Sequence, residues 1–171
     1  MIKQNIGDIL SLDRGILVHG CNCQGFMGAG IAAAIRAKWP AVYQAYRDRR
    51  AEFGLQLGDI IPVYGDISKN AAAARRHGSA ARAFDGGMPP ELIVVNAMTQ
   101  YSFGRDGVHV DYDAVEAAFL RVKLLARDSG LPVHFPLIGC GLAGGDWVEV
   151  SARIERALGD DVDKTLWILP S

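Results

Sequence analysis

Two stretches of this sequence combine glycines with side chains suited to binding or hydrolysing a phosphorylated ligand. The first, HGCNCQGFMGAGIAAAI at 19–35, places Asn22 and Gln24 just ahead of three glycines. The second, PLIGCGLAGGDW at 136–147, also follows an apolar run. Glycine loops that lead into a helix expose unpaired backbone N–H groups at the positive end of the helix dipole, and they let an anion approach closely. The pair predicts two loops that hold a diphosphate from both sides of one crevice.

The first loop also matches the dinucleotide fingerprint in form, because GAGIAA at 28–33 fits G-x-G-x-x-G/A. That fingerprint needs its first glycine directly after a strand, and an acid at the end of a second strand about twenty residues later. Here HGCNCQGFM separates the apolar run from Gly28, and Asp48 lies in a polar, helical stretch. A nicotinamide-binding Rossmann unit is therefore disfavoured. For this loop alone, a plain tight turn remains the alternative.

The elements that must position these loops alternate between strands and helices. Short apolar runs bounded by Gly or Pro predict strands at 15–20, 58–65, 91–98, 131–139 and 164–170, with a weaker candidate at 1–6. Apolar residues at three- and four-residue steps predict helices at 111–128 and 147–158. The segment after Gly30 is helical until Pro40, which either breaks the helix or opens a new one. Asp146 is placed to cap the helix at 147, with Glu149 completing a capping box.

Length and composition fit one α/β domain over residues 1–171 with a mostly parallel central sheet. Charged residues make up 22% and the net charge is −1, which argues against an electrostatic nucleic-acid platform. Three cysteines are too few for a disulfide framework, and no apolar run reaches membrane-spanning length, so we expect a cytoplasmic protein with no membrane partner. Residues 66–90 lack the steady periodicity of the other segments, which predicts a surface excursion with a helical turn at 71–76. Its basic residues, Arg75, Arg76, His77 and Arg82, suit either a solvated loop or an acidic partner.

Four motifs, taken together and in order, resemble the macro domain: GDI at 7–9, VHGCNCQGFMGAGIAAAI at 18–35, VVNAMTQ at 94–100 and PLIGCGLAGGDW at 136–147. The similarity covers nearly the whole chain apart from 66–90. The nearest branch holds the terminal ADP-ribose protein glycohydrolase and the yeast-type ADP-ribose 1″-phosphate phosphatase. The resemblance implies a three-layer α/β/α sandwich with a mixed, mostly parallel sheet.

The resemblance also implies that ADP-ribose or a derivative is the ligand, with no cofactor and no metal. Asp8 would accept a hydrogen bond from the adenine amino group, and the C-terminal strand around Trp167 and Leu169 would lie near the adenine. The glycine loops would hold the diphosphate, and Asn22 would lie beside the distal ribose. The implied binding set is Asp8, Ile9, Asn22, Gln24, Met27, Gly28, Ala29, Gly30, Ile31, Thr99, Ile138, Gly139, Cys140, Gly141 and Leu142.

One departure from the glycohydrolase branch bears on the chemistry. The attacking lysine of that branch would fall near Thr99 and Gln100, where this chain has no lysine, and the assisting acid is replaced by Ala143. Hydrolysis of ADP-ribose 1″-phosphate is the function this pattern favours, with Asn22 orienting the ribose and His19 or Asp146 positioning or deprotonating water. A reader that binds without turnover, and a hydrolase acting on acylated, protein-linked or nucleic-acid-linked ADP-ribose, are the alternatives. ADP-ribosylated macromolecules are accordingly a second class of partner.

Simpler readings exist for several of these residues. Asp8 suits a turn, Asn22 suits hydrogen bonds to its own loop, and Trp167 suits the core. His19, Cys21 and Cys23 alternate like one strand face, but a zinc site lacks a fourth ligand at the usual spacing, which favours buried small residues. Cys140 fits a small loop residue better than a nucleophile.

Overall fold

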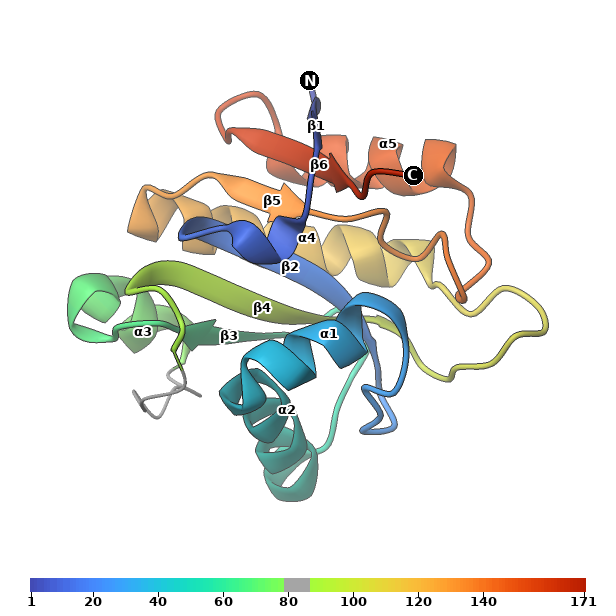
Figure 1. The fold of residues 1–171 in the computed structure, drawn as a ribbon, viewed down its shortest axis with the longest axis horizontal. Helices are drawn as coiled ribbons and strands as arrows, with labels where there is room; N and C mark the ends of the chain where they lie inside the picture. The colour runs from blue at the N-terminus through green and yellow to red at the C-terminus, as the bar shows by residue number, and fades with distance from the viewer. Residues whose placement is uncertain (79–86) are drawn as a thin grey trace.

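A single six-stranded sheet forms the centre of the computed structural model, which describes residues 1–78 and 87–171 (Figure 1). The strand order is β1-β6-β5-β2-β4-β3, and every neighbouring pair is parallel except β3 with β4. The strands are β1 (Lys3–Ile6), β2 (Arg14–Asn22), β3 (Ile60–Tyr64), β4 (Glu91–Gln100), β5 (Val133–Phe135) and β6 (Lys164–Ile168). The six strand predictions are confirmed, although β5 is short because Pro136 opens a loop directly after it.

Helices cover both faces of this sheet (Figure 1). They are η1 (Ile9–Ser11), α1 (Gly30–Lys38), α2 (Pro40–Phe53), η2 (Ser68–Asn70), α3 (Ala71–His77), α4 (Tyr112–Ser129) and α5 (Trp147–Leu158). α1 and α2 pack together on one face, whereas α4 and α5 pack together on the other, with α3 beside α4. The predicted α/β/α sandwich with a mixed, mostly parallel sheet is confirmed. Pro40 opens α2 as its first residue, which decides between the two roles considered for it.

Two basic side chains of α3, Arg76 and His77, have an acidic partner within the chain. The expected helical turn at 71–76 is part of α3. Arg76 Nη1 lies 3.1 Å and His77 Nε2 2.8 Å from the Asp128 carboxylate on α4. These contacts tie the start of the 66–90 excursion to the second helical layer. Residues 79–86, which include Arg82, lie outside the described residues.

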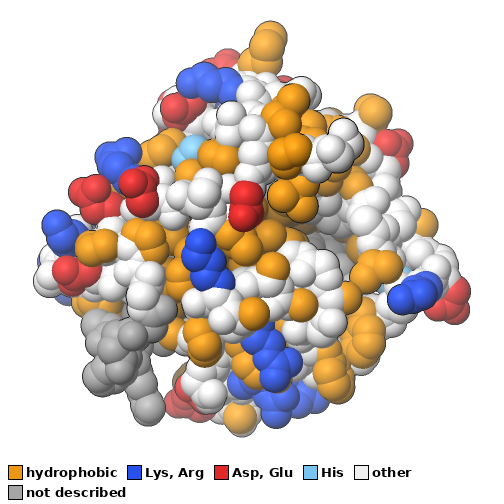
Figure 2. Space-filling view, in the orientation of Figure 1, with side chains coloured by type: hydrophobic (Ala, Val, Ile, Leu, Met, Phe, Trp, Pro, Cys, Tyr) orange, Lys and Arg blue, Asp and Glu red, His pale blue; other side chains and the backbone are white. Residues whose placement is uncertain are grey.

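Charged side chains of both signs lie on the face in view in Figure 2. In the described part of the chain, no helix is long and apolar enough to cross a membrane. Figure 2 shows Lys and Arg side chains beside Asp and Glu over part of this face, and a group of Lys and Arg side chains at its lower edge. The distribution agrees with the net charge of −1.

The core positions the loops by fixing β2 in the middle of the sheet. Ile16, Leu17 and Val18 of β2 are fully buried, with helices on both sides. β2 pairs in parallel with β4 on one side and β5 on the other. Because parallel strands end at the same edge, the loops after β2, β4 and β5 meet there.

Replacement of a buried α4 residue tests this packing. Phe119 has no exposed surface and meets Phe135 of β5 edge to face, with ring centroids 5.6 Å apart. We expect Phe119→Ala to lower the free energy of unfolding by about 3–5 kcal/mol in urea denaturation. The neighbouring Leu120 is 50% exposed, so Leu120→Ala should change it by less than about 0.5 kcal/mol. Equal losses in the two variants would contradict the assigned burial of α4.

Candidate functional site

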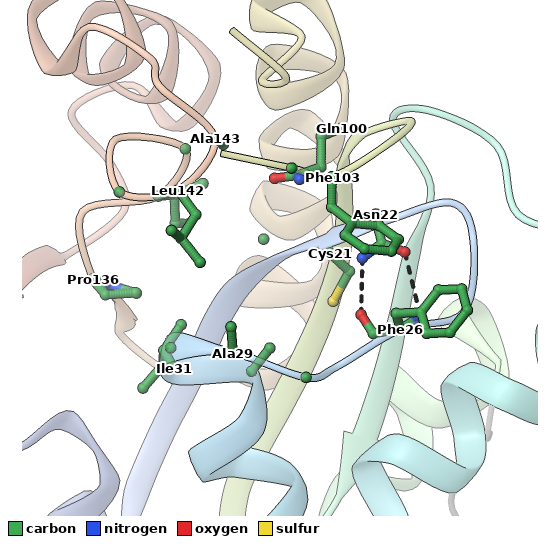
Figure 3. Close-up of a pocket in the computed structure, with 18 of the residues that line it drawn as sticks. Cys21, Asn22, Phe26, Ala29, Ile31, Gln100, Phe103, Pro136, Leu142 and Ala143 are labelled. Carbon is green, nitrogen blue, oxygen red and sulfur yellow. Dashed lines mark hydrogen bonds between the residues drawn. The ribbon is translucent and has the colours of Figure 1, made fainter. Parts of the chain in front are cut away.

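A pocket of about 500 Å³ lies at the carboxyl ends of β2, β4 and β5, between the two glycine loops (Figure 3). This volume falls within the range typical of small-ligand sites. Four segments line it: Gly20–Asn22 at the end of β2, Phe26 with Gly28–Ala32 in the first loop and α1, Gln100 with Phe103–Arg105 after β4, and Pro136–Gly139 with Gly141–Ala143 in the second loop. The pocket therefore brings together the two loops that the sequence paired.

The first loop presents an uncapped helix N-terminus to the pocket. Ala29, the N-cap of α1, makes no side-chain hydrogen bond to the helix. Gly28 and Gly30 face open space, since a Cβ at either would meet nothing within 4 Å, and Gly30 has a φ of +57°. Within the described residues, the N–H groups from Gly28 to Ala32 have no hydrogen-bond acceptor. Such N–H groups, at the positive end of the helix dipole, favour an anion.

The second loop faces the first with donors of its own. Gly139 has a φ of +73°, and the turn is closed by Gly145 N donating to Gly139 O at 2.7 Å. The N–H groups of Gly141, Leu142 and Ala143 have no acceptor among the residues that the structure describes. A Cβ at Gly141 would also meet nothing within 4 Å. Both predicted cradles thus carry backbone donors that no protein group satisfies.

A third segment, residues 101–110, completes the wall and was missed by the sequence analysis. His109 N donates to Ala143 O at 2.8 Å, which ties this segment to the second glycine loop. Phe103 pairs with Phe26 across the mouth, with ring centroids 5.1 Å apart and both side chains about half exposed. Arg105 follows Phe103 in the lining. The missing information was the strand order, because only the pairing of β4 with β2 brings this segment to the pocket.

Asn22 lies at the end of β2 and its side chain is held in one orientation (Figure 3). Its Oδ1 accepts hydrogen bonds from Gln24 N at 3.0 Å and Phe26 N at 3.3 Å, while its Nδ2 donates to Phe26 O at 2.8 Å. The hydroxyl of Tyr46, on α2, lies 2.9 Å from the same Oδ1. The amide is therefore fixed by the loop and still lines the pocket.

The lining is nearly free of charge. Among the described residues, Arg105 is the one charged side chain in it, and no lysine, histidine or carboxylate contributes. The rest consists of backbone amides, the Asn22 and Gln100 side-chain amides, and apolar groups. This arrangement suits a ligand with negative charge, and it supplies positioning and hydrogen bonds rather than an acid–base pair.

The predicted site residues divide into two groups. Those that line the pocket are Asn22, Gly28, Ala29, Gly30, Ile31, Ile138, Gly139, Gly141 and Leu142. Those outside its lining are Asp8, Ile9, His19, Gln24, Met27, Thr99, Cys140 and Asp146. Gln100 lines the pocket, whereas its neighbour Thr99 is fully buried with no partner for its hydroxyl in the described structure.

His19 lies in the core rather than at the pocket. It has no exposed surface, and its Nε2 is 2.6 Å from Asn96 Oδ1, the side chain of its register partner on β4. Asn96 in turn donates to Val42 O of α2 at 3.1 Å. Burial lowers the pKa of His19 to about 4. A general base must reach the water that it activates, so this geometry gives no support to the catalytic role expected for His19.

Asp146 is occupied as the N-cap of α5. Its carboxylate accepts a hydrogen bond from Val148 N at 2.9 Å, which confirms the predicted cap. Glu149 instead contacts Arg153 Nε at 2.8 Å, so the expected return bond of a capping box is absent from the described contacts. Since Asp146 does not line the pocket, its position supports a structural role.

Asp8 lies at the same edge of the sheet, but beyond the pocket. Its carboxylate accepts from Leu10 N at 2.9 Å and caps η1, and Ile9 is buried. Gly7 N donates to Ile168 O at the end of β6. Trp167 is half-buried and donates from Nε1 to His134 Nδ1 at 3.1 Å. These residues border the region expected for adenine without contributing to the pocket lining.

The remaining predicted residues support the loops from within. Met27 is buried, and Gln24 contributes its backbone N–H to the Asn22 turn. Cys140 Sγ contacts Ile138 O, and burial raises the pKa of this thiol, which disfavours a nucleophile. Burial also raises the pKa of Cys21, whose Sγ lies 3.7 Å from His19 Nε2. Across residues 1–78 and 87–171, no group of three or more His, Cys, Asp or Glu side chains is arranged to hold a metal ion.

The chain is similar to known proteins in sequence and in fold. No family model matches the chain. It is 25% identical to the ADP-ribose 1″-phosphate phosphatase of Scheffersomyces stipitis, over 99% of this chain and all of that protein. It is 24% identical to the DNA ADP-ribosyl glycohydrolase of Mycobacterium tuberculosis, over 98% of this chain but 42% of that protein. A macrodomain protein structure from Streptomyces coelicolor superimposes with a TM-score of 0.73 at 26% identity, covering 98% of this chain and 99% of that one.

The fold and the facing glycine loops place the chain among three-layer α/β proteins with a ligand site at the carboxyl edge of the sheet. The agreement in fold and length then makes the class specific: the chain has the fold of the macrodomains and is 25–26% identical to the Scheffersomyces stipitis and Streptomyces coelicolor proteins.

The burial of His19 predicts a pH dependence of stability. Between about pH 4 and pH 6.5, folded His19 binds fewer protons than unfolded His19, so the free energy of unfolding falls as the pH falls through this window. We expect a loss of about 3 kcal/mol across it. Urea denaturation from pH 7.5 to pH 4 would measure this loss. His134, whose pKa burial also lowers, adds to it in any variant that retains that residue.

The matched variant is His19→Gln, which removes the titration but keeps a polar group beside Asn96. The curve for His19→Gln should be flatter than the wild-type curve by about the amount assigned to His19. Identical slopes in the two proteins would show that His19 is not the buried neutral group described here.

The capping geometry predicts different outcomes for two Asp146 variants. Asp146→Ala should lower the free energy of unfolding by about 1 kcal/mol. Asp146→Asn should lower it by less, because asparagine also caps helices. Neither variant should lose ligand binding in a calorimetric titration with ADP-ribose. A stable Asp146→Asn protein that binds ADP-ribose but has lost turnover would return Asp146 to a catalytic role.

Proposed function

We propose that this chain binds ADP-ribose and hydrolyses ADP-ribose 1″-phosphate to ADP-ribose and phosphate. The observation that carries the proposal is the pair of glycine loops whose backbone N–H groups face one pocket without protein acceptors in the described chain. The full-length similarity to a phosphatase of that name supports the same substrate.

The diphosphate fits between the loops. The uncapped first turn of α1 offers donors and the positive end of its dipole from one side, and residues 141–143 offer donors from the other. Hydrogen bonds from backbone N–H to a charged oxygen are stronger than neutral ones. Two facing sets of amides can therefore hold a diphosphate without a lysine.

The order of the strands suggests how the ligand is oriented along the carboxyl edge of the sheet. Asn22 and Phe103 mark one end of the pocket, and Pro136 and Ile31 the other (Figure 3). Beyond that second end, Asp8 follows β1, which is three strand spacings from β2, roughly 14 Å at about 4.8 Å per spacing. We place the distal ribose at Asn22 and the adenine toward Asp8, which has room to accept from an amino group because its carboxylate is exposed.

Phosphoryl transfer suits a pocket without a base. In the reaction a water oxygen forms a bond to phosphorus, the bond from phosphorus to the 1″ oxygen breaks, and one water proton passes to the ribose oxygen. The transition state is loose and spreads charge over the phosphoryl oxygens, so positioning and charge stabilisation contribute most of the catalysis. Backbone amides and Arg105 provide such stabilisation, and Asn22 would orient the ribose.

Glycohydrolysis through a lysine adduct is not proposed. The resemblance gives the lysine a position near Thr99 and Gln100, where no lysine occurs, and the assisting acid the position of Ala143; Gln100 and Ala143 line the pocket. The same lack of ionisable lining groups supports a reader that binds ADP-ribose without turnover. This reader is the principal alternative.

A hydrolase for ADP-ribose linked to a macromolecule or an acyl group is the other alternative. The mouth beside Asn22 is flanked by the exposed rings of Phe26 and Phe103, which leaves space for a group attached to the distal ribose. The Mycobacterium tuberculosis relative is named for release of ADP-ribose from DNA. Assays with such linked substrates would separate this activity from the phosphatase.

Gly141→Val tests the shared premise of ADP-ribose binding. A Cβ at Gly141 would meet nothing within 4 Å, and Gly141 lines the pocket, so we expect the added side chain to occupy space that the ligand would use. We expect at least a tenfold loss of ADP-ribose affinity by calorimetry, since each lost hydrogen bond to a charged group costs about 1.5–3 kcal/mol. The control is Ala152→Val on the exposed face of α5, which should bind as the wild type does. Absence of binding by the wild type would overturn the proposal.

Phosphate release from ADP-ribose 1″-phosphate then separates the enzyme from the reader. The wild type should release phosphate, and Asn22→Ala should release it more slowly. Binding without release above the buffer rate would leave the reader as the function.

A further inference from the structure

The turn at 22–26 is held by a residue that lies outside the pocket. Tyr46 belongs to the middle of α2 and has no exposed surface. Its hydroxyl lies 2.6 Å from Asn22 O and 2.9 Å from Asn22 Oδ1, and it accepts a hydrogen bond from Gly25 N at 3.0 Å. One hydroxyl thus contacts the backbone at both ends of the turn as well as the side chain that lines the pocket.

A second contact from α2 closes the same turn. Gly25 has a φ of +91°, and a Cβ there would lie 2.8 Å from Arg50 Cδ. Tyr46 and Arg50 are four residues apart, so they share one face of α2, and that face packs on the turn. The positive φ favours glycine at this position, whereas the flexible Arg50 side chain could shift, and α2 supports the turn from outside the loop.

The hydrogen bonds fix the orientation of the Asn22 amide. Asn22 Oδ1 accepts from the N–H groups of Gln24 and Phe26, and the Tyr46 hydroxyl, whose one hydrogen is shared between Asn22 O and Oδ1, lies 2.9 Å away. A rotated amide would turn its NH₂ group toward two N–H donors, which is unfavourable. One N–H of Nδ2 is donated to Phe26 O, and the other has no acceptor among the described residues. Burial raises the pKa of Tyr46, so the hydroxyl keeps its proton.

We propose that Tyr46 is a positioning residue that fixes the Asn22 amide for the distal ribose of the ligand. The inference rests on the proposed function for the identity of that ligand. Tyr46 itself does not line the pocket, so it acts through Asn22. Second-layer hydrogen bonds of this kind hold a binding group in its productive orientation.

The test compares ADP-ribose with ADP, which lacks the distal ribose. Tyr46→Phe removes the hydroxyl and leaves the packing volume of the ring. We expect ADP-ribose to bind about tenfold more weakly, consistent with the loss of one or two buried hydrogen bonds, while ADP affinity changes by less than about twofold. In an Asn22→Ala background, Tyr46→Phe should weaken ADP-ribose binding no further, because the two residues act as one unit.

The matched control is Tyr64→Phe. Tyr64 is also a buried tyrosine, but its hydroxyl has no hydrogen-bond partner in the described structure. Its removal should leave both affinities unchanged. Equal weakening of ADP and ADP-ribose by Tyr46→Phe would indicate a purely structural role, and wild-type affinity for ADP-ribose in that variant would overturn the proposal.

Hydrogen exchange of the Asn22 side-chain amide tests the same proposal without a ligand. In ¹⁵N-labelled protein, the Asn22 side-chain NH₂ pair should exchange more slowly with water in the wild type than in Tyr46→Phe, by at least about tenfold, because loss of the hydroxyl weakens the turn that holds the amide. Unchanged exchange would contradict the positioning role. If the wild type fails to bind ADP-ribose, the proposed function falls, whereas this signal still decides whether Tyr46 holds Asn22.

Discussion

Parallel pairing of β2 with both β4 and β5 is the constraint on which the site depends. Leu17 of β2 pairs with Val94 on one side and with His134 on the other, so three strands run in the same direction through the core. Their carboxyl ends meet at one edge, where the chain leaves each strand as a loop. The two glycine loops and the 101–110 segment are neighbours for this reason, although more than a hundred residues separate the first loop from the second.

The helices and strands could be predicted from the sequence because the patterns that indicate them are local. Val115, Phe119 and Val122 follow the helical period, and all three are fully buried in α4. The strands are short apolar runs between Gly and Pro residues, and Pro40 opens α2 at the position that suits its fixed φ. Both predicted glycine loops line one pocket, and the prediction was possible because two strand–glycine–helix junctions occur in one small domain. The three-layer fold then followed from the alternation of strands with helices.

The strand order and the direction of individual side chains could not be predicted from the sequence. His19 lies in a strand that helices cover on both faces, so the sequence carries no polar alternation to show that its side chain points at Asn96 of β4 and away from the pocket. Asp146 satisfies two descriptions, helix cap and acid near a ligand, and its contact with Val148 N supports the first. Phe103 and Arg105 carry no motif and reach the pocket only through the pairing of β4.

The near-absence of ionisable groups from the pocket lining has a consequence for how a ligand arrives. A protein of net charge −1 exerts little long-range attraction on an anionic nucleotide, so the encounter is governed by ordinary diffusion rather than by electrostatic steering. Main-chain dipoles act only after contact, at distances well inside the Debye length of about 8 Å at physiological ionic strength. Salt should therefore screen the contribution of Arg105 far more than that of the main-chain amides. Differences in affinity among ligands should then lie in the rate of dissociation from the pocket rather than in the rate of association.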